Sequence, residues 1–441
     1  MILAELFYLV SGVGAVSFFL LFAIASIGES KGRAALVSGL AALLVGTLWW
    51  MTYVIAAPSS LVLCLMAALG PLAALLCFLP LNGRTPLTIS GVTERIDERD
   101  VIFSREEYLP GTEKYDTYYR LRPEKKAGDD KLRALPELLA PGGLYYDPIG
   151  SKEVSATFRI IEGLTGSVDG KVGPGRDAIA PEAATEMVKS MALRLGADAV
   201  GIARLDPMFV YSHVGRGPEK WGAPIENNHT FAIVMAFEMD YGPVEGAPRL
   251  PITKETAVKY LKGARVSIAV AQHLRTLGYG ARAHIAGSNY QIVLPAVAHD
   301  AGLGELGRMG YLISPRFGAR FRLGALTTDL PLIADRPVVF GVQDFCALCK
   351  KCAHNCPSGA IPKEEKEVVR GVEKWQINIE KCLHYWRVAG TDCGLCMKVC
   401  PYSHPSSLVH NVVRAAIRDS ALTRKLSLWG DDLFYGRKIF P

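Results

Sequence analysis

Ten residues of this chain are cysteines, and eight of them lie in two runs near the C-terminus. Two-residue gaps let one tight backbone loop present several thiolates to the iron corners of a cubane cluster. The spacing therefore predicts two [4Fe–4S] clusters, and with them a chain through which electrons pass. The runs are Cys346-x2-Cys349-x2-Cys352-x3-Cys356-Pro357 and Cys382-x10-Cys393-x2-Cys396-x3-Cys400-Pro401.

The fourth ligand of each cluster is expected to cross over from the other run, as the cysteine before proline does in two-cluster ferredoxins. The second run differs from a ferredoxin run, because ten residues separate its first two cysteines and would loop out between ligands. Structural zinc is the alternative, since C-x2-C pairs also suit tetrahedral zinc. The predicted ligands are Cys346, Cys349, Cys352 and Cys400 for cluster one, and Cys382, Cys393, Cys396 and Cys356 for cluster two.

Three apolar stretches occupy the N-terminal part of the chain, at about Leu6–Ile27, Ala34–Ala57 and Leu61–Leu81. Each is close to the ~20 residues that a membrane-spanning helix needs. The N-terminus has no basic residue before the first stretch, which disfavours a cleavable signal peptide. We therefore expect a permanent three-helix anchor in contact with membrane lipid; buried helices of a soluble protein are the alternative. Cys64 and Cys77 fall in this apolar region and are expected to be packing residues.

The basic residues beside these stretches predict the orientation of the anchor. Lys31 and Arg33 lie in the first loop, and Arg84 follows the third stretch. By the positive-inside rule, these charges place the soluble region on the cytoplasmic side of the cell membrane, as part of a multi-pass protein. The net charge of +6 is scattered along the chain rather than arranged as a stripe, so nucleic acid is not an expected partner.

The soluble region changes character along its length. Residues 87–165 are polar and turn-rich, and they suggest a strand at Thr117–Leu121 and a charged loop at Lys125–Lys131. After residue 178, helices are predicted at Pro181–Leu195 and Thr253–Leu277, and strands at Ala199–Ala203 and Thr230–Phe237. Helices layered on a sheet can bury a flat cofactor.

Glycine is frequent between residues 302 and 310, where the chain reads Gly302-x-Gly304-x-x-Gly307. Glycines allow close approach of the backbone to a ligand. A dinucleotide-binding loop is disfavoured, because a continuous apolar strand does not precede the motif and no suitable acidic residue follows it.

Several motifs together resemble one family, the corrinoid and iron–sulfur reductive dehalogenases, with the epoxyqueuosine reductases as related proteins. The resemblance covers about residues 88 to 438. Glu305 and Arg308 favour the dehalogenases, because the related family has a Trp and a Lys in this loop. The motifs are Ala301-Gly302-Leu303-Gly304-Glu305-x2-Arg308-Met309-Gly310, Ile313-Ser314-Pro315, Thr328-Asp329-Leu330-Pro331-Leu332, Phe345-Cys346 and Cys382-Leu383-x-Tyr385-Trp386.

The resemblance implies an α+β fold in which a nitroreductase-like α/β core binds cobalamin and a ferredoxin-like domain carries two [4Fe–4S] clusters. It also implies cobalamin in the base-off form. The Asp-x-His-x-x-Gly pattern that supplies a cobalt ligand in other B12 enzymes is absent, although His284-x2-Gly287 comes near it. The expected parts are an anchor at 1–82, a packing region at 83–177, the corrinoid core at 178–335, the cluster domain at 336–411 and a C-terminal segment at 412–441.

The resemblance also implies the catalytic residues. Tyr260 falls at the position of a proton-donating tyrosine, Arg322 at that of a cation which stabilises the phenolate, and Asn289 at a further polar position. Free tyrosine has a pKa of about 10, so a neighbouring cation is a physical requirement for an acid at neutral pH. Without the resemblance, Tyr260 would be read as a packing residue. Corrinoid contacts are expected from Tyr290, Gln291, Gly302, Gly304 and Ser314.

The function expected from these features is replacement of carbon–halogen by carbon–hydrogen in a small organohalide. A ferredoxin, a flavodoxin or a quinol-linked reductase would donate the electrons. Two alternatives remain: reduction of a non-halogenated substrate, as in epoxyqueuosine reductases, and a non-catalytic electron-transfer protein of the membrane.

Overall fold

The computed structural model of the chain describes residues 2–56, 83–287 and 290–439, with a few isolated positions between 57 and 82. The chain divides into two compact units. The first combines Met1–Pro86, Phe340–Lys351 and His404–Pro441, and the second combines Leu87–Val339 and Cys352–Ser403. The five-part division expected from the sequence stays a prediction.

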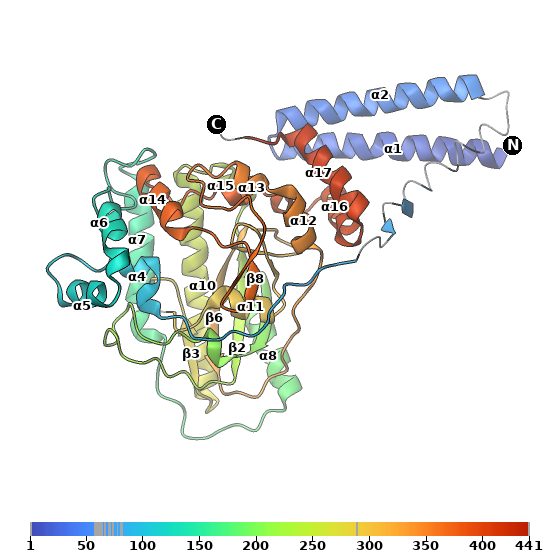
Figure 1. Ribbon diagram of the computed structural model, residues 1–441. Helices are drawn as coiled ribbons and strands as arrows, with labels where there is room; N and C mark the ends of the chain where they lie inside the picture. Colours follow the sequence, from blue (N-terminus) through green and yellow to red (C-terminus); the bar gives the residue numbers. More distant parts are fainter. Residues whose placement is uncertain are drawn as a thin grey trace. The chain divides into compact units, whose positions relative to one another are not determined.

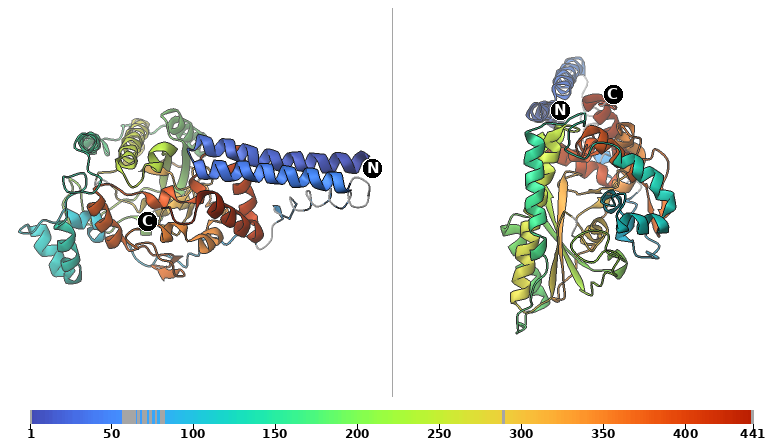
Figure 2. Two further views of the ribbon diagram at one scale, coloured as in Figure 1. Left: turned by 90° about the horizontal axis from the view of Figure 1, so that it is seen from above. Right: turned by 90° about the vertical axis from the view of Figure 1, so that its left-hand side faces the viewer.

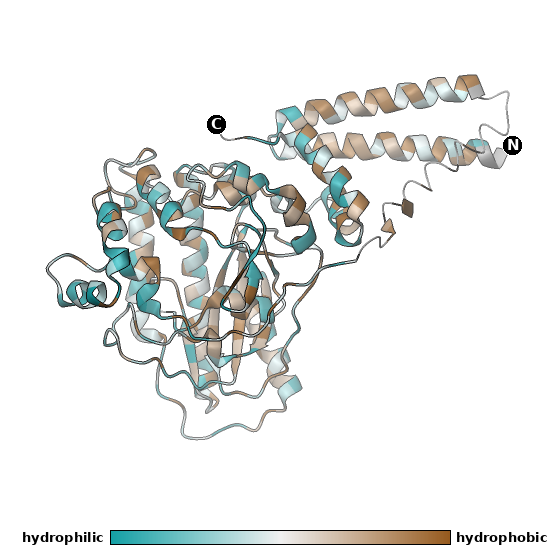
Figure 3. Ribbon diagram, in the orientation of Figure 1, coloured by the Kyte–Doolittle hydropathy of each residue, from teal (hydrophilic) through white to brown (hydrophobic). Residues whose placement is uncertain are grey.

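Two long helices, α1 (Ile2–Gly28) and α2 (Gly32–Ala56), form a hairpin in the first unit (Figure 1). The Tyr8 ring stacks on Trp49 with 4.7 Å between ring centroids, and a Cβ at Gly12 would lie 2.2 Å from the Trp49 ring. Small residues of this kind let two apolar helices approach closely. Figure 3 shows that apolar residues dominate both helices.

Both helices of the hairpin are long and apolar enough to cross a membrane, over Glu5–Gly28 and Gly32–Ile55. The first two predicted spans are therefore confirmed as apolar helices. The described residues contain two such helices rather than three, and the third predicted span, Leu61–Leu81, lies outside them.

The other described elements of the first unit are helices. Serine side chains cap two of its helices, because Ser407 accepts a hydrogen bond from the His410 amide and Ser420 accepts one from the Thr423 amide. These two helices pack on each other and on the hairpin. The helices are α12 (Val342–Cys349), α16 (Leu408–Asp419) and α17 (Ala421–Tyr435), and α13 (Lys351–His354) begins at the boundary between the units.

The second unit contains a four-stranded sheet with the order β1-β2-β6-β3, in which every neighbouring pair is antiparallel. Its central pair aligns Phe237 with Arg322 and Val234 with Ala325. An antiparallel sheet with helices is consistent with the predicted α+β class. The strands are β1 (Ala199–Arg204), β2 (Phe231–Glu238), β3 (Ala281–His284) and β6 (Phe321–Thr328).

Both faces of this sheet are buried. Ile233, Met235 and Phe237 of β2 belong to one hydrophobic cluster, and the alternate residues Val234 and Ala236 belong to another. This alternation follows from the two-residue repeat of a strand. Helices α8 (Pro181–Arg194) and α10 (Leu250–Thr276) contribute to the first cluster, and α11 (Leu294–Asp300) contributes to the second. Figure 2 shows α7 (Gly150–Gly163) running beside α10.

The prediction for residues 87–165 was wrong in its local structure. The predicted strand Thr117–Leu121 lies in helix α5 (Glu113–Leu121), and the predicted loop Lys125–Lys131 lies in α6 (Pro123–Arg133). Thr112 caps α5, and its tyrosines at positions 115, 118 and 119 form one buried helical face. A β-like composition of tyrosine and threonine therefore concealed a helical spacing.

The other elements of the second unit are short. They are η1 (Glu98–Asp100), α4 (Ile102–Glu106), η2 (Thr165–Ser167), η3 (Pro207–Phe209), α9 (Tyr241–Glu245), β4 (Glu305–Leu306), β5 (Leu312–Ile313), β7 (Glu367–Val369), β8 (Val372–Lys374), α14 (Ile379–Ala389), α15 (Leu395–Lys398) and η4 (Pro401–Ser403).

Candidate active site

A cavity of about 500 Å³ lies in the second unit, and residues of both α10 and β6 line it. Its lining is mostly aromatic and aliphatic, with a few charged and hydroxyl groups, as in small-molecule sites. Tyr260, Arg322 and Tyr290, all predicted from the sequence, contribute to it. Other lining residues include Phe158, Thr253, Thr256, Tyr311, Trp386 and Asp392.

Tyr260 and Arg322 lie against each other in the cavity. The guanidinium carbon of Arg322 is 5.6 Å from the centroid of the Tyr260 ring. Burial acts to lower the pKa of Arg322, but the neighbouring Tyr260 and Asp392 outweigh it and raise that pKa. The arginine is therefore a permanent buried cation beside the phenol.

Asp392 holds this arginine in place. Arg322 Nη2 donates to Thr256 Oγ1 at 2.8 Å and lies 3.3 Å from Asp392 Oδ2. The same carboxylate accepts hydrogen bonds from Thr253 Oγ1 at 2.8 Å and from Thr256 Oγ1 at 2.7 Å. Thr256 precedes Tyr260 by one helical turn, so one face of α10 both orients the cation and presents the phenol.

Two glycines bring α10 close enough to β6 for this arrangement. A Cβ at Gly324 would lie 2.9 Å from Ser267 Oγ and 3.2 Å from the Gly263 carbonyl oxygen. A Cβ at Gly263 would lie 3.2 Å from the Phe237 ring. Because alternate residues of a strand share a face, Arg322 points to the same side of the sheet as Gly324, toward α10.

Tyr290 lines the cavity, and burial together with the neighbouring Tyr260 raises its pKa well above the usual range. The nearby His284 cannot serve as a cobalt ligand in this conformation. Its Nδ1 accepts from the Gln291 amide at 3.2 Å, and its Nε2 is 3.1 Å from Thr327 Oγ1. Burial lowers the pKa of His284 well below its usual value, so the ring is neutral.

The remaining predicted corrinoid contacts are not among the residues that line this cavity. Gly302 and Gly304 pack against backbone, since a Cβ would lie 2.6 Å from the Arg336 carbonyl oxygen and 2.4 Å from the Ile313 carbonyl oxygen, respectively. Ser314 Oγ accepts from the Arg316 amide at 3.2 Å. Gln291 lies between the lining residues Tyr290 and Ile292 and borders a small recess that shares Tyr290 with the cavity. Asn289 lies outside the described residues.

The four predicted ligands of cluster two lie together in the second unit. Burial and the adjacent Cys356 raise the pKa of Cys382 to about 11. Burial raises the pKa of Cys396 well above its usual value, and Cys393, Cys382 and Cys356 act in the same direction. None of the four is joined in a disulfide. Crowded, buried thiols of this kind fit a [4Fe–4S] cluster, because bound iron replaces their protons.

The backbone around Cys393 is shaped for close packing. Cys393 has a φ of 53°, a left-handed conformation that is uncommon for a residue with a side chain. A Cβ at the following Gly394 would lie 1.9 Å from Ile252 Cδ1. The segment between Cys382 and Cys393 does not simply loop out as expected, because α14 continues to Ala389 and Asp392 reaches the cavity.

The ligands predicted for cluster one are placed in both units. Cys346 and Cys349 lie on α12 in the first unit, whereas Cys352 lies on α13 and Cys400 precedes η4 in the second. All four are buried. Their assignment to one cluster stays a prediction.

Sequence reasoning missed Thr253, Thr256 and Asp392. The two threonines are spaced three residues apart on a predicted helix, and the aspartate directly precedes a cluster cysteine. Neither pattern indicates a shared site, because the contact arises only when α10 packs against the cysteine-rich segment.

Comparisons with known proteins found similar sequences and structures. A 4Fe-4S dicluster domain family matches residues 345–404. The tetrachloroethene reductive dehalogenase of Sulfurospirillum multivorans is 33% identical over 297 residues, which are 59% of this chain and 59% of that protein. The chain thus spans about three fifths of the length of this curated relative.

A solved reductive dehalogenase, whose description refers to B12-dependent dehalogenation, matches 81% of this chain and 49% of its own length, with a TM-score of 0.65 and 27% identity. The epoxyqueuosine reductase of a Synechococcus strain is 32% identical over 153 residues, which are 32% of this chain and 45% of that protein. The chain is thus similar to the reductive dehalogenases over about three fifths of its length, and to an epoxyqueuosine reductase over about a third.

Proposed function

We propose that this chain catalyses the reductive dehalogenation of a small organohalide, using base-off cobalamin and electrons that arrive through two [4Fe–4S] clusters. The observation that carries the proposal is the buried pair of Tyr260 and Arg322 inside a largely apolar cavity. An apolar wall suits a halocarbon, and the pair combines a proton donor with a fixed positive charge.

The balance of the reaction defines what the protein must supply. Exchange of a halogen for hydrogen consumes two electrons and one proton, and it releases a halide ion. Tyr260 donates the proton to carbon, and its phenolate is stabilised by Arg322, which Thr256 and Asp392 hold in place. An oriented cation of this kind requires little rearrangement as the phenolate charge develops.

Cobalamin, when bound, supplies a cobalt centre able to deliver two electrons to the carbon–halogen bond. The corrinoid core is inferred to be nitroreductase-like, with Tyr290 at the cavity wall. Gln291, Gly302, Gly304 and Ser314, which are outside the lining of the cavity, stay predicted contacts. The hydrogen bonds at both ring nitrogens of His284 leave that ring with no lone pair to offer cobalt, so we do not expect it to be a cobalt ligand.

Electrons would reach the cavity from cluster two. Arg322 Nη1 is 3.7 Å from the sulfur of Met397, the residue after Cys396. Tyr311 lines the cavity and lies near Cys396. Burial raises the pKa of Tyr311 well above its usual value, and the nearby Cys396 raises it further. The end of the electron path and the proton donor therefore meet at one cavity.

We further infer that the α1–α2 hairpin inserts in the lipid of the cell membrane as part of a multi-pass anchor, with the α1–α2 loop on the cytoplasmic side. Lys31 and Arg33 support this orientation through the positive-inside rule. Within the first unit, Glu29 of that loop bonds to His404 and His410, so the loop and the C-terminal helices share one side. A ferredoxin, flavodoxin or quinol-linked reductase is the proposed electron donor.

The test is turnover of the anaerobically purified, cobalamin-loaded protein on chlorinated ethenes and halogenated phenols, with a low-potential chemical reductant. We expect Y260F to lower kcat by about 10²–10⁴, with about one cobalt and about eight irons retained per chain. Y279F is the matched control, because the Tyr279 hydroxyl donates to the Asp177 carbonyl away from the cavity. Turnover that survives in Y260F would show that another group donates the proton. A fully loaded wild-type protein without activity on either halide class would refute dehalogenation.

A further inference from the structure

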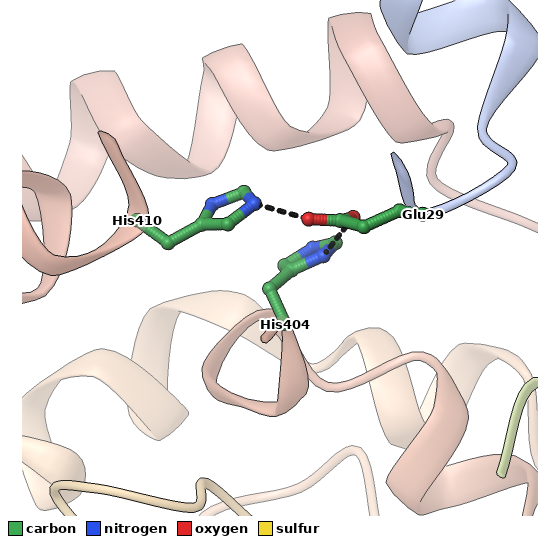
Figure 4. A group of neighbouring side chains, drawn as sticks. All are labelled: Glu29, His404 and His410. Atoms are coloured by element: carbon green, nitrogen blue, oxygen red, sulfur yellow. Dashed lines mark hydrogen bonds and ion pairs between the residues drawn. The ribbon is translucent and has the colours of Figure 1, made fainter. Parts of the chain in front are cut away.

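A second cluster of ionisable side chains lies in the first unit and takes no part in the proposed reaction. It consists of Glu29 in the α1–α2 loop, His404 after η4 and His410 in the first turn of α16 (Figure 4). Glu29 Oε2 is 3.0 Å from His404 Nδ1, and Glu29 Oε1 is 2.5 Å from His410 Nε2. All three side chains are largely buried.

The geometry points to a metal site: we propose that Glu29, His404 and His410 bind one divalent transition-metal ion of the zinc class. The three potential ligand atoms lie within 4.8 Å of one another. Two ligands of a tetrahedral zinc ion, each about 2.0–2.2 Å from the metal, are separated by about 3.4 Å. The observed spacing needs only small side-chain rotations to reach that arrangement.

The ligand types favour this class of ion. Two imidazoles with one carboxylate are a common three-ligand set for zinc, with a fourth position for water. Calcium and magnesium prefer oxygen ligands throughout, so two nitrogen ligands disfavour them. Cluster iron is held by thiolates, and a cysteine is not among these three residues.

The surroundings of His404 resemble the support that metal-binding histidines receive. Nδ1 of His404 faces Glu29, and its Nε2 is 3.7 Å from Asp431 Oδ1. Lys351, itself buried, forms an ion pair with Asp431. A carboxylate behind a coordinating imidazole fixes the orientation of the ring and increases its basicity as a ligand. Tyr435 Oη also lies 3.4 Å from Glu29 Oε2.

The three ligands come from the two ends of the chain. Glu29 follows α1, whereas His404 and His410 belong to the C-terminal part of the same unit. A bound ion would tie the loop of the apolar hairpin to the C-terminal helices. The proposal does not depend on the dehalogenation activity.

The experiment uses the whole purified chain with its cofactors, in detergent, dialysed against Zn(II) and then against zinc-free buffer. We expect about one zinc per chain, and an X-ray absorption spectrum with nitrogen or oxygen ligands at about 2.0–2.1 Å rather than sulfur at about 2.3 Å. E29Q and H410Q should each lower the affinity for zinc at least tenfold and leave the iron content unchanged. H273Q, at the end of α10, is the control and should retain the metal.

Three outcomes would overturn the proposal. They are the absence of retained zinc in the wild-type protein, zinc with sulfur ligands alone, which would place it at the cysteine runs, and equal zinc binding by wild type, E29Q and H410Q. The spectrum of the wild-type protein remains decisive if a variant fails to fold.

Discussion

Two buried polar clusters of this molecule differ in how completely their hydrogen-bonding capacity is used. In the second unit, Arg322 Nε is buried and has no hydrogen-bond partner among the described residues, although Nη2 of the same group is bonded to Thr256. In the first unit, Glu29 has a histidine at each carboxylate oxygen. The group around Arg322 borders a cavity, whereas the group around Glu29 is enclosed by protein.

This difference separates a site for chemistry from a site for structure. A buried cation with unused capacity beside an open volume can stabilise charge that develops on a ligand. A carboxylate whose two oxygens both have hydrogen-bond partners instead holds together the segments that carry those partners. Substitutions in the two clusters should therefore affect different measurements, turnover in one case and stability with metal content in the other.

The largest effect should come from the cysteines that connect the cavity to the electron supply. Because Cys396 is a predicted ligand of cluster two, C396S should reduce the iron content from about eight to about four per chain and reduce turnover to background. Iron analysis and the anaerobic dehalogenation assay measure these effects. C77S, outside both cysteine runs, is the control. Full iron content in C396S would contradict the assignment of this ligand.

D392N should affect both stability and turnover. The substitution removes the carboxylate partner of a buried arginine, and breaking such a pair costs about 3–5 kcal/mol. Chemical unfolding measures that cost, and turnover should fall with it as Arg322 loses its orientation. E153Q removes one partner of the exposed Lys254 ion pair and should cost less than about 1 kcal/mol. Equal stability losses in the two variants would show that Asp392 is no more important than a surface charge.

E29Q should lower stability without changing turnover. Loss of the charged hydrogen bonds to His404 and His410 should cost about 1.5–3 kcal/mol, seen as a lower midpoint in thermal unfolding of the detergent-solubilised chain. The dehalogenation assay with a chemical reductant should give the wild-type kcat. A large fall in kcat would contradict the proposal that the group around Glu29 serves the structure and takes no part in the reaction.

G324A should produce the smallest effect and test the geometry alone. The added methyl group would meet Ser267 Oγ and the Gly263 carbonyl oxygen, so α10 must shift away from β6 at a cost of about 1–3 kcal/mol. The variant keeps both Tyr260 and Arg322. A fall in kcat would therefore show that the distance between these two side chains has increased. G128A, in the exposed part of α6, has open space around the new Cβ and is the control. Unchanged kcat and stability in G324A would show that the close crossing of helix and strand is unnecessary.

The sequence predicted the regular elements best where their periodicity is long. Helix α10, strand β2 and the two apolar helices were found close to their actual bounds, because each has a repeated apolar pattern over many residues. It failed at residues 113–133, where tyrosine and threonine suggested strand and the helical spacing of the tyrosines was overlooked. The α1–α2 loop also carries Glu29, whose partners lie more than 370 residues away and leave no local signal.

The amino-acid sequence by itself determined the two cysteine runs, the apolar helices and, through its resemblance to a known family, Tyr260 and Arg322 as a proposed pair. The spacing of cysteines and the length of an apolar stretch are local properties of the sequence, and a sequence motif can be recognised without knowledge of the fold. Only the tertiary structure places Asp392, Thr253 and Thr256 beside Arg322. It also provides hydrogen-bond partners for both ring nitrogens of His284 and brings Glu29 into contact with His404 and His410. Such contacts depend on which faces of distant segments pack together. The same packing buries these groups, and burial makes each contact energetically important.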